Sequence, residues 1–153
     1  MTDLKFSPSK IFNNANKTIE AYHLTLSPLC KKTGIPPLAL DILLFIANNP
    51  DNATAKDVCR LRGFKSGIVS VHVERLVSYG LLDRVSDGSD RRKVILKPTE
   101  KSSEIIEDGQ RIQKEFAAAI LNGLSKEDLE LMRNTMIKIE NNVDSVIKEY
   151  KNV

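Results

Sequence analysis

Residues 54–97 contain two short helix signals, a tight turn and a charged hairpin tip, in that order. Thr54 to Asp57 form an N-cap pattern in which an acidic residue follows three positions after the threonine. Gly63 is suited to end that first helix in a left-handed conformation, and a second helix is predicted over residues 65–79. Because very few residues link the two helices, they must cross steeply, as in a helix-turn-helix.

After the second helix the residue pattern changes from helical to strand-like. Residues 82–85 and 93–97 are predicted to form two strands, and the tip between them is Asp87-Gly88-Ser89-Asp90-Arg91-Arg92. An Asp-Gly pair between two such segments is a strong turn signal, so we predict a two-stranded hairpin.

Amphipathic helices are predicted on both sides of this segment. Residues 9–31 have apolar side chains at spacings of three and four, and Pro28 near their end predicts a kink or an early stop. Residues 38–47 are apolar almost all round, which predicts a central helix. After the hairpin, one helix is expected to run to about residue 122 and a last helix to begin at Ser125. The predicted fold is mainly α with a small β-hairpin.

The last helix has a heptad seam, in which the spacing of the apolar residues alternates between three and four. The seam residues are Leu129, Met132, Met136, Ile139, Val143, Val146 and Tyr150. Since neither end of the chain has enough residues beside it to cover such a seam, we expect residues 1–33 and 99–153 to form dimerisation helices that pack on a second copy. A two-fold homodimer would place two equivalent helices about one DNA turn, roughly 34 Å, apart on a pseudo-palindrome.

Positive charge is concentrated in the helix-turn-helix and hairpin. Residues 55–97 contain ten Lys or Arg against five Asp or Glu, a net +5, whereas the whole chain has a net charge of +3. Such a concentration is either a phosphate-binding surface or a solvated face, and charge alone leaves both interpretations open.

Composition disfavours several other classes of protein. A chain of 153 residues corresponds to one domain, and no apolar segment approaches the roughly 18 residues of a membrane span. The first residues lack a signal peptide, and two cysteines are too few for a disulfide framework, so we expect a cytoplasmic protein. No catalytic constellation and no metal-ligand spacing is visible, which predicts a protein that is not an enzyme and needs no metal or cofactor.

Taken in order, these elements resemble the multiple-antibiotic-resistance-regulator (MarR) family of bacterial winged-helix transcription regulators. The matching residues are Thr54-Ala55-Lys56-Asp57-Val58, Gly63, Val69, Glu74-Arg75-Leu76, Gly80-Leu81-Leu82, Asp90-Arg91-Arg92, Thr99-Glu100-Lys101 and Gly123 to Leu129. The resemblance implies a single MarR-like domain over residues 1–153, with a winged helix-turn-helix lobe at residues 35–98. Arg62 departs from the family, which usually has an apolar residue before the turn glycine. Either the turn is rotated or Arg62 reaches outward to a phosphate.

The resemblance implies DNA contacts from the second helix, which would enter the major groove, and from the hairpin, or wing. Arg92 is the candidate for insertion into the minor groove, with Asp90 orienting it and Arg91 and Lys93 contacting phosphates. The full candidate set is Lys65, Ser66, Gly67, Ser70, Val71, Arg75, Asp90, Arg91, Arg92 and Lys93.

For three basic residues the sequence suggests a contact with the DNA backbone, and for one of them, Arg75, an alternative stays open. Arg75 is expected either to contact the DNA backbone or to pair within the protein with Glu74 or Asp83. Lys56 and Arg60, on the first helix of the motif, are candidates for contacts with the DNA backbone.

In proteins of the MarR family, which this chain resembles, a ligand pocket lies between the dimerisation helices and the DNA-binding lobe. The candidates to line it here are Tyr22, Leu26, Ile46 and His72, although His72 is also explained as a core residue. The leading hypothesis is a homodimeric regulator, most often a repressor in this family, that binds double-stranded DNA and responds to a small-molecule effector. The alternatives are a winged-helix module that binds protein and a ligand-sequestering protein without operator binding.

Overall fold

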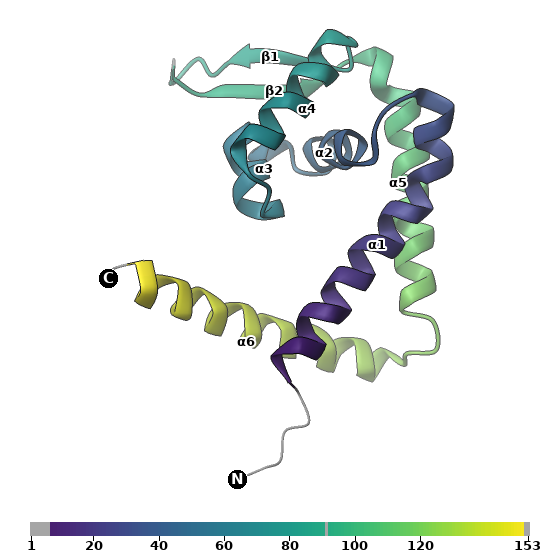
Figure 1. The fold of residues 1–153 in the computed structure, drawn as a ribbon, viewed down its shortest axis with the longest axis vertical. Helices are drawn as coiled ribbons and strands as arrows, with labels where there is room; N and C mark the ends of the chain where they lie inside the picture. The colour runs from purple at the N-terminus through teal and green to yellow at the C-terminus, as the bar shows by residue number, and fades with distance from the viewer. Residues whose placement is uncertain (1–6, 91, 152–153) are drawn as a thin grey trace. The chain divides into compact units, whose positions relative to one another are not determined.

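The computed structural model describes residues 7–90 and 92–151. Figure 1 shows the order of the helices and strands along the chain. The elements are α1 (Pro8–Thr33), α2 (Pro37–Asn48), the 3₁₀ turn η1 (Pro50–Asn52), α3 (Ala55–Arg62), α4 (Ser66–Ser78), β1 (Leu82–Ser86), β2 (Val94–Pro98), the 3₁₀ turn η2 (Glu100–Ser102), α5 (Ser103–Ile120) and α6 (Lys126–Lys151). This mainly helical fold with one antiparallel hairpin confirms the predicted fold class.

The chain divides into two compact units. Met1–Phe116 make up the first, with α1 to α4, the hairpin and most of α5, and Ala117–Val153 make up the second, with the end of α5 and all of α6. Within the described part of the chain, no helix has the length and apolar content needed to cross a bilayer. The predicted arrangement of one domain with a lobe at residues 35–98 between dimerisation helices stays a prediction.

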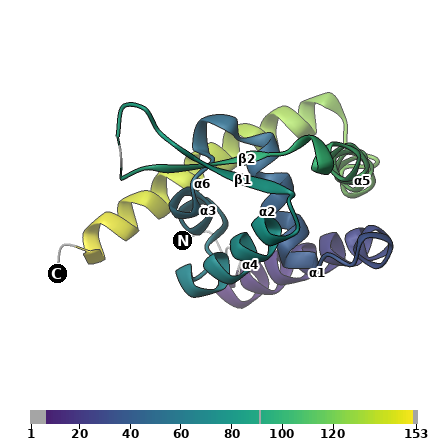
Figure 2. The same ribbon diagram turned by 90° about the horizontal axis from the view of Figure 1, so that it is seen from above.

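Helix α2 is the centre of the first unit, as its apolar sequence predicted. Leu40, Ile42, Leu43 and Leu44 are completely buried. α1, α3, α4 and β2 all contact α2, and Figure 2 shows it among them. Because burying each such side chain contributes about 1.5–3 kcal/mol, this helix is the largest single source of stability in the unit.

The helix-turn-helix has the predicted local geometry. The Thr54 hydroxyl accepts a hydrogen bond of 3.1 Å from the backbone N–H of Asp57 and so caps α3. At the other end Gly63 has φ of 70°, a left-handed conformation that favours glycine, and its N–H donates to the carbonyl of Cys59. The turn that leads into α4 is therefore not rotated.

The hairpin is anchored to the core at its root. β1 and β2 pair antiparallel with Leu82 opposite Pro98 and Val85 opposite Ile95. Leu82 and Leu96 are buried, and the Leu96 N–H donates a 2.7 Å hydrogen bond to the carbonyl of Ala53, just before α3. The rest of the hairpin extends from the helices as a narrow arm (Figure 2).

Two local expectations differ from the structure. Pro28 does not stop α1, which continues to Thr33, so the predicted early stop is wrong. Pro98-Thr99, at the end of the hairpin, was expected to cap the next helix, but Thr99 precedes the 3₁₀ turn η2, and its hydroxyl donates a hydrogen bond of 2.6 Å to the carbonyl of Gly80. That hydrogen bond ties the start of η2 to Gly80, two residues after the end of α4, which the sequence pattern did not reveal.

Gly109 allows α5 to approach α2 closely, and this gives a test of the packing. A Cβ atom at Gly109 would lie 2.5 Å from Cδ2 of the buried Leu44. We predict that Gly109→Ala lowers the free energy of unfolding by about 1–3 kcal/mol in chemical denaturation, because a packed core has no room for the methyl group. Gly67→Ala is the matched control, since a Cβ there meets nothing within 4 Å. The control should raise stability by up to about 1 kcal/mol; a stabilised Gly109→Ala variant would contradict the packing.

Candidate nucleic-acid interface

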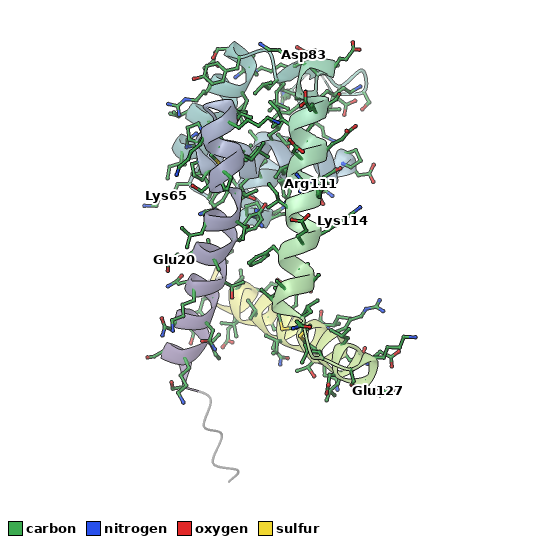
Figure 3. All side chains as sticks on the ribbon, turned by 90° about the vertical axis from the view of Figure 1, so that its right-hand side faces the viewer. Glu20, Lys65, Asp83, Arg111, Lys114 and Glu127 are labelled. Atoms are coloured by element: carbon green, nitrogen blue, oxygen red, sulfur yellow. The ribbon has the colours of Figure 1, made fainter. Side chains whose placement is uncertain are left out.

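Helix α4 has one buried face and one exposed face. Val69, Val73 and Leu76 point into the core and are at most 3% exposed. Val71, on the opposite face, is 58% exposed. The other candidate residues at the start of this helix, Lys65, Ser66, Gly67 and Ser70, are exposed as well. Figure 3 shows the Lys65 side chain projecting from the molecule. The structure therefore leaves all five residues accessible to a nucleic acid.

Gly67 is not required by the packing of the protein itself. Its φ is not positive, and a Cβ at this position would meet no neighbouring atom within 4 Å. Glycine in a helix costs up to about 1 kcal/mol relative to alanine, so the position is less stable than it could be. A glycine on the exposed face lets another molecule approach the backbone of α4 closely.

The second half of α4 has a different set of contacts. The Glu74 carboxylate pairs with Arg84 on β1 at 2.8 Å. No ion pair joins Arg75 to Glu74 or Asp83 in the described part of the chain, so of the two alternatives for Arg75 only the contact with DNA stays a prediction. Burial, and next the charge of Arg75, lowers the pKa of the half-buried His72, which keeps its imidazole neutral at physiological pH.

Hydrogen bonds within the wing shape its tip. The Asp87 carboxylate accepts hydrogen bonds from the backbone N–H of Ser89 at 3.1 Å and from its hydroxyl at 2.8 Å. The first of these contributes most to lowering the pKa of Asp87, so its carboxylate stays ionised. The Asp90 carboxylate accepts 2.9 Å from the backbone N–H of Arg92. Asp90 therefore positions the backbone that carries Arg92; Arg91 lies outside the described residues.

A groove of about 720 Å³ lies between the wing and the start of α3. It is lined by Asp51, Asn52, Thr54, Ala55, Lys56, Asp57, Arg60, Asp90, Arg92, Lys93 and Val94. Four of these residues are cations, and they come from segments more than thirty positions apart in the sequence. The sequence indicated Lys56 and Arg60 only as candidates for contacts with the DNA backbone. In the structure they line the same groove as Arg92 and Lys93 of the wing.

Three acidic residues, Asp51, Asp57 and Asp90, also line the groove, and Asp57 and Asp90 make local hydrogen bonds. The Asp57 carboxylate accepts 2.6 Å from the Thr54 hydroxyl and 3.1 Å from Arg60, and the Thr54 hydrogen bond is the main cause of its lowered pKa. Lys93 lies 3.7 Å from Asp87. Asp57 and Asp87, of which Asp87 lies outside the groove lining, are thus paired within the fold, while exposed Lys56 and Arg92 add positive charge to the groove.

Arg62 does not belong to this surface. Its Nη2 atom donates to both carboxylate oxygens of Asp41 on α2, at 2.6 and 2.5 Å. Because the side chain reaches toward α2, the expected outward contact with a phosphate is wrong. Asp41 and Arg62 are 21 positions apart, and no sequence signal linked them.

A second cavity, of about 460 Å³, lies between α1, α2, α5 and the end of α3. Its lining residues are Thr18, Ile19, Tyr22, Asp41, Phe45, Asn48, Asn49, Arg62, Gln113 and Phe116. Of the four residues expected to line a ligand pocket, only Tyr22 does so. Leu26 and Ile46 are fully buried core residues, and His72 lies on α4 and is absent from the lining.

A helix-turn-helix with an exposed second helix and a basic groove beside its hairpin defines a winged-helix DNA-binding lobe. Residues 33–93 match the model of the MarR family. The match spans the winged helix-turn-helix and confirms that this segment resembles the MarR family.

One relative and two solved structures are similar to this chain over most of its length. The chain is 24% identical over 114 residues to YdgJ, an uncharacterized HTH-type transcriptional regulator of Bacillus subtilis (strain 168), covering 74% of this chain and 69% of the relative. A putative MarR family regulator from Listeria monocytogenes in complex with 26mer DNA has a TM-score of 0.75 at 16% identity, covering 92% of this chain and 90% of that chain. The MepR–DNA complex of S. aureus has a TM-score of 0.72 at 17% identity, covering 92% of this chain and 99% of that one. The two structures show that the fold is shared.

The hydrogen bond from Arg92 to Asp90 gives a prediction for the wing. Asp90→Ala removes the acceptor for the Arg92 N–H, so exchange of this amide with solvent should accelerate about tenfold, as expected for the loss of one hydrogen bond to a charged group. NMR hydrogen exchange measures the rate. Global thermal stability should stay unchanged, because Asp90 is exposed; unchanged exchange at Arg92 would show that Asp90 does not hold the wing backbone.

Proposed function

We propose that the chain is a homodimeric repressor that binds double-stranded, pseudo-palindromic operators in the cytoplasm. The observation that carries the proposal is the basic groove between α3 and the wing, where Lys56, Arg60, Arg92 and Lys93 gather beside the exposed face of α4. The two DNA complexes among structures of the same fold support it.

Each part of this surface has a separate task on DNA. The start of α4 enters the major groove, where Val71 contacts a thymine methyl group and Gly67 lets the helix backbone approach the base edges. The Arg92 guanidinium enters the minor groove, which is narrow and negative in A-tracts. Lys56 and Lys93 contact phosphates, and these contacts set the register without reading sequence.

The terminal helices support the proposed homodimer. α6 is 26 residues long and carries the heptad seam from Leu129 to Tyr150, and among the described residues of its compact unit no other element is of comparable length to cover that seam. Near the start of α1, Phe12 is 67% exposed. Large exposed apolar surfaces mark interaction sites, and a coiled-coil seam fits a second copy of the same helix.

The 460 Å³ cavity supports modulation by a small molecule. Its volume lies within the range of about 300–1,000 Å³ typical of small-molecule sites, and Tyr22, Phe45 and Phe116 provide aromatic walls. The alternative of a module that binds only protein has less support, because the cations of the groove suit a phosphate backbone.

DNA binding is tested by selecting bound sites from random DNA and measuring their affinity at several salt concentrations. Arg92→Ala should weaken binding to the selected site about tenfold or more, because a contact of this kind contributes about 1–3 kcal/mol. The variant should also show a weaker dependence of DNA affinity on salt concentration. With one cation fewer on the DNA, fewer counterions are released on binding.

Lys114→Ala is the matched control, since it removes an exposed cation from α5, away from the groove (Figure 3). It should leave affinity and salt dependence unchanged. Selection of no preferred sequence, or equal losses in both variants, would contradict the proposed function.

The homodimer is tested on α6. Val143→Glu places a charge in the seam and should convert a dimer to a monomer in sedimentation equilibrium, with weaker operator binding and little loss of helix in circular dichroism. Asn142→Glu adds the same charge beside the seam and should leave the dimer intact. A wild-type chain that sediments as a monomer would rule out the proposed assembly.

A further inference from the structure

Two branched apolar side chains lie next to each other on the exposed surface of α4. Ile68 is 44% exposed and Val71 is 58% exposed. Residues three positions apart are neighbours on a helix, so these two side chains form one apolar patch, the Ile68–Val71 patch. A single exposed apolar residue needs no explanation, but branched side chains are less favourable in a helix than alanine, and two of them in contact with water do not stabilise the fold. A contact outside the protein explains the patch better than folding does.

The backbone beside this patch is open to a close approach. Gly67 precedes Ile68, and a Cβ atom at Gly67 would meet no atom within 4 Å. The exposed side chains of Ser66 and Ser70, in the same turns of the helix, are small as well. Because their neighbours are so short, Ile68 and Val71 are the apolar groups that a molecule lying against the start of α4 meets first.

The first turns of α4 carry few groups that can distinguish bases by hydrogen bonds. Pairs of hydrogen bonds to base edges come mainly from Arg or Lys on guanine and from Asn or Gln on adenine. Between Lys65 and Glu74 the sequence has no Arg, Asn or Gln, and Arg75 lies in the last turn of the helix. The Glu74 carboxylate pairs with Arg84 at 2.8 Å, and the Nδ1 atom of His72 is buried. The serine hydroxyls both donate and accept, so they fit any base.

The chemistry of the patch matches one feature of the major groove. The C5 methyl group of thymine is the apolar group on the base edges there, and apolar side chains contact it. Lys65, the N-cap residue of α4, is exposed, and a flexible point charge at this position suits a phosphate. Together with the cations of the groove beside the wing, it attracts DNA to this surface, while Gly67 permits the short distances that dispersion contacts require.

We propose that the Ile68–Val71 patch binds the C5 methyl groups of pyrimidines in each half-site, and that the chain selects its operator by these methyl groups and not by hydrogen bonds to base edges. Methyl recognition rests on the proposed DNA-binding function and specifies what the surface of α4 recognises. A consequence follows for modified DNA. 5-Methylcytosine carries a methyl group at the same carbon as thymine and replaces thymine at the contacted positions, whereas cytosine and uracil lack this group and do not.

Changes to the DNA test this without altering the protein. Each thymine of the selected half-site is replaced in turn by deoxyuridine, and the affinity of the full chain is measured by fluorescence anisotropy. At the contacted positions the affinity should fall about fourfold, because burying one carbon of this size contributes about 0.8 kcal/mol and 1.4 kcal/mol is a factor of ten. Replacing the same T·A pair by C·G should weaken binding at least as much. 5-Methylcytosine in place of that cytosine should restore most of the lost affinity.

The double variant Ile68→Ala/Val71→Ala tests whether the patch causes this effect. Alanine favours an exposed helix, so the variant should fold and keep its phosphate contacts, with a lower affinity for the thymine operator. Because the variant no longer reaches the methyl groups, it should bind the thymine and deoxyuridine sites equally. Ser70→Ala is the matched control, since it changes an exposed residue of the same helix without removing apolar surface. The control should keep the difference of about fourfold between the two sites.

Three results would overturn the proposal: wild-type affinity that deoxyuridine leaves unchanged at every thymine of the half-site, a 5-methylcytosine site that binds no better than the cytosine site, and a double variant that keeps the wild-type preference for thymine. A chain that selects no preferred sequence would contradict the proposed function and methyl recognition together. A selected operator whose affinity does not depend on methyl groups would contradict methyl recognition alone, so the two failures are distinguishable.

Discussion

Burial of α2 on every side is the constraint on which the rest of the first unit depends. Six of its apolar residues, Ala39, Leu40, Ile42, Leu43, Leu44 and Ile46, are buried, and α1, α3, α4 and β2 all pack around it. The close approach of α5 at Gly109 adds a further wall. Because these contacts share one helix, the helix-turn-helix is built directly on the core, and a change at α2 reaches both the DNA-binding surface and the cavity beside it.

The DNA-binding surface uses this core as a rigid support. The root of the hairpin is fixed by buried Leu82 and Leu96 and by the hydrogen bond from Leu96 to Ala53. That contact brings the wing next to the start of α3, which is why cations from two distant segments share one groove. The described residues of the tip are shaped by local hydrogen bonds, such as the one from Arg92 to Asp90. A rigid root with a locally shaped tip suits the proposed entry of the wing into a minor groove.

Local signals in the sequence predicted most of the fold. These signals depend on residues that are close in the chain, so they can be recognised in the sequence alone. They are the caps at Thr54 and Gly63, the apolar sequence of α2 and the Asp-Gly turn of the hairpin. The same holds for the exposure of the start of α4. The lining of the cavity was less predictable, because Tyr22 and Leu26 share one helical seam. Only the packing of α2 and α5 decides that Tyr22 faces the cavity while Leu26 enters the core.

The sequence by itself determined the class of the protein: a winged helix-turn-helix with its positive charge concentrated in residues 55–97. Only the tertiary structure decided what Arg62 does. In the sequence it was one more cation near a turn, a candidate for a phosphate contact. In the structure its charge is taken up by Asp41, because the crossing of α2 and α3 brings together two residues that are 21 positions apart. Pairing across such a distance depends on how helices pack, and no local spacing encodes it.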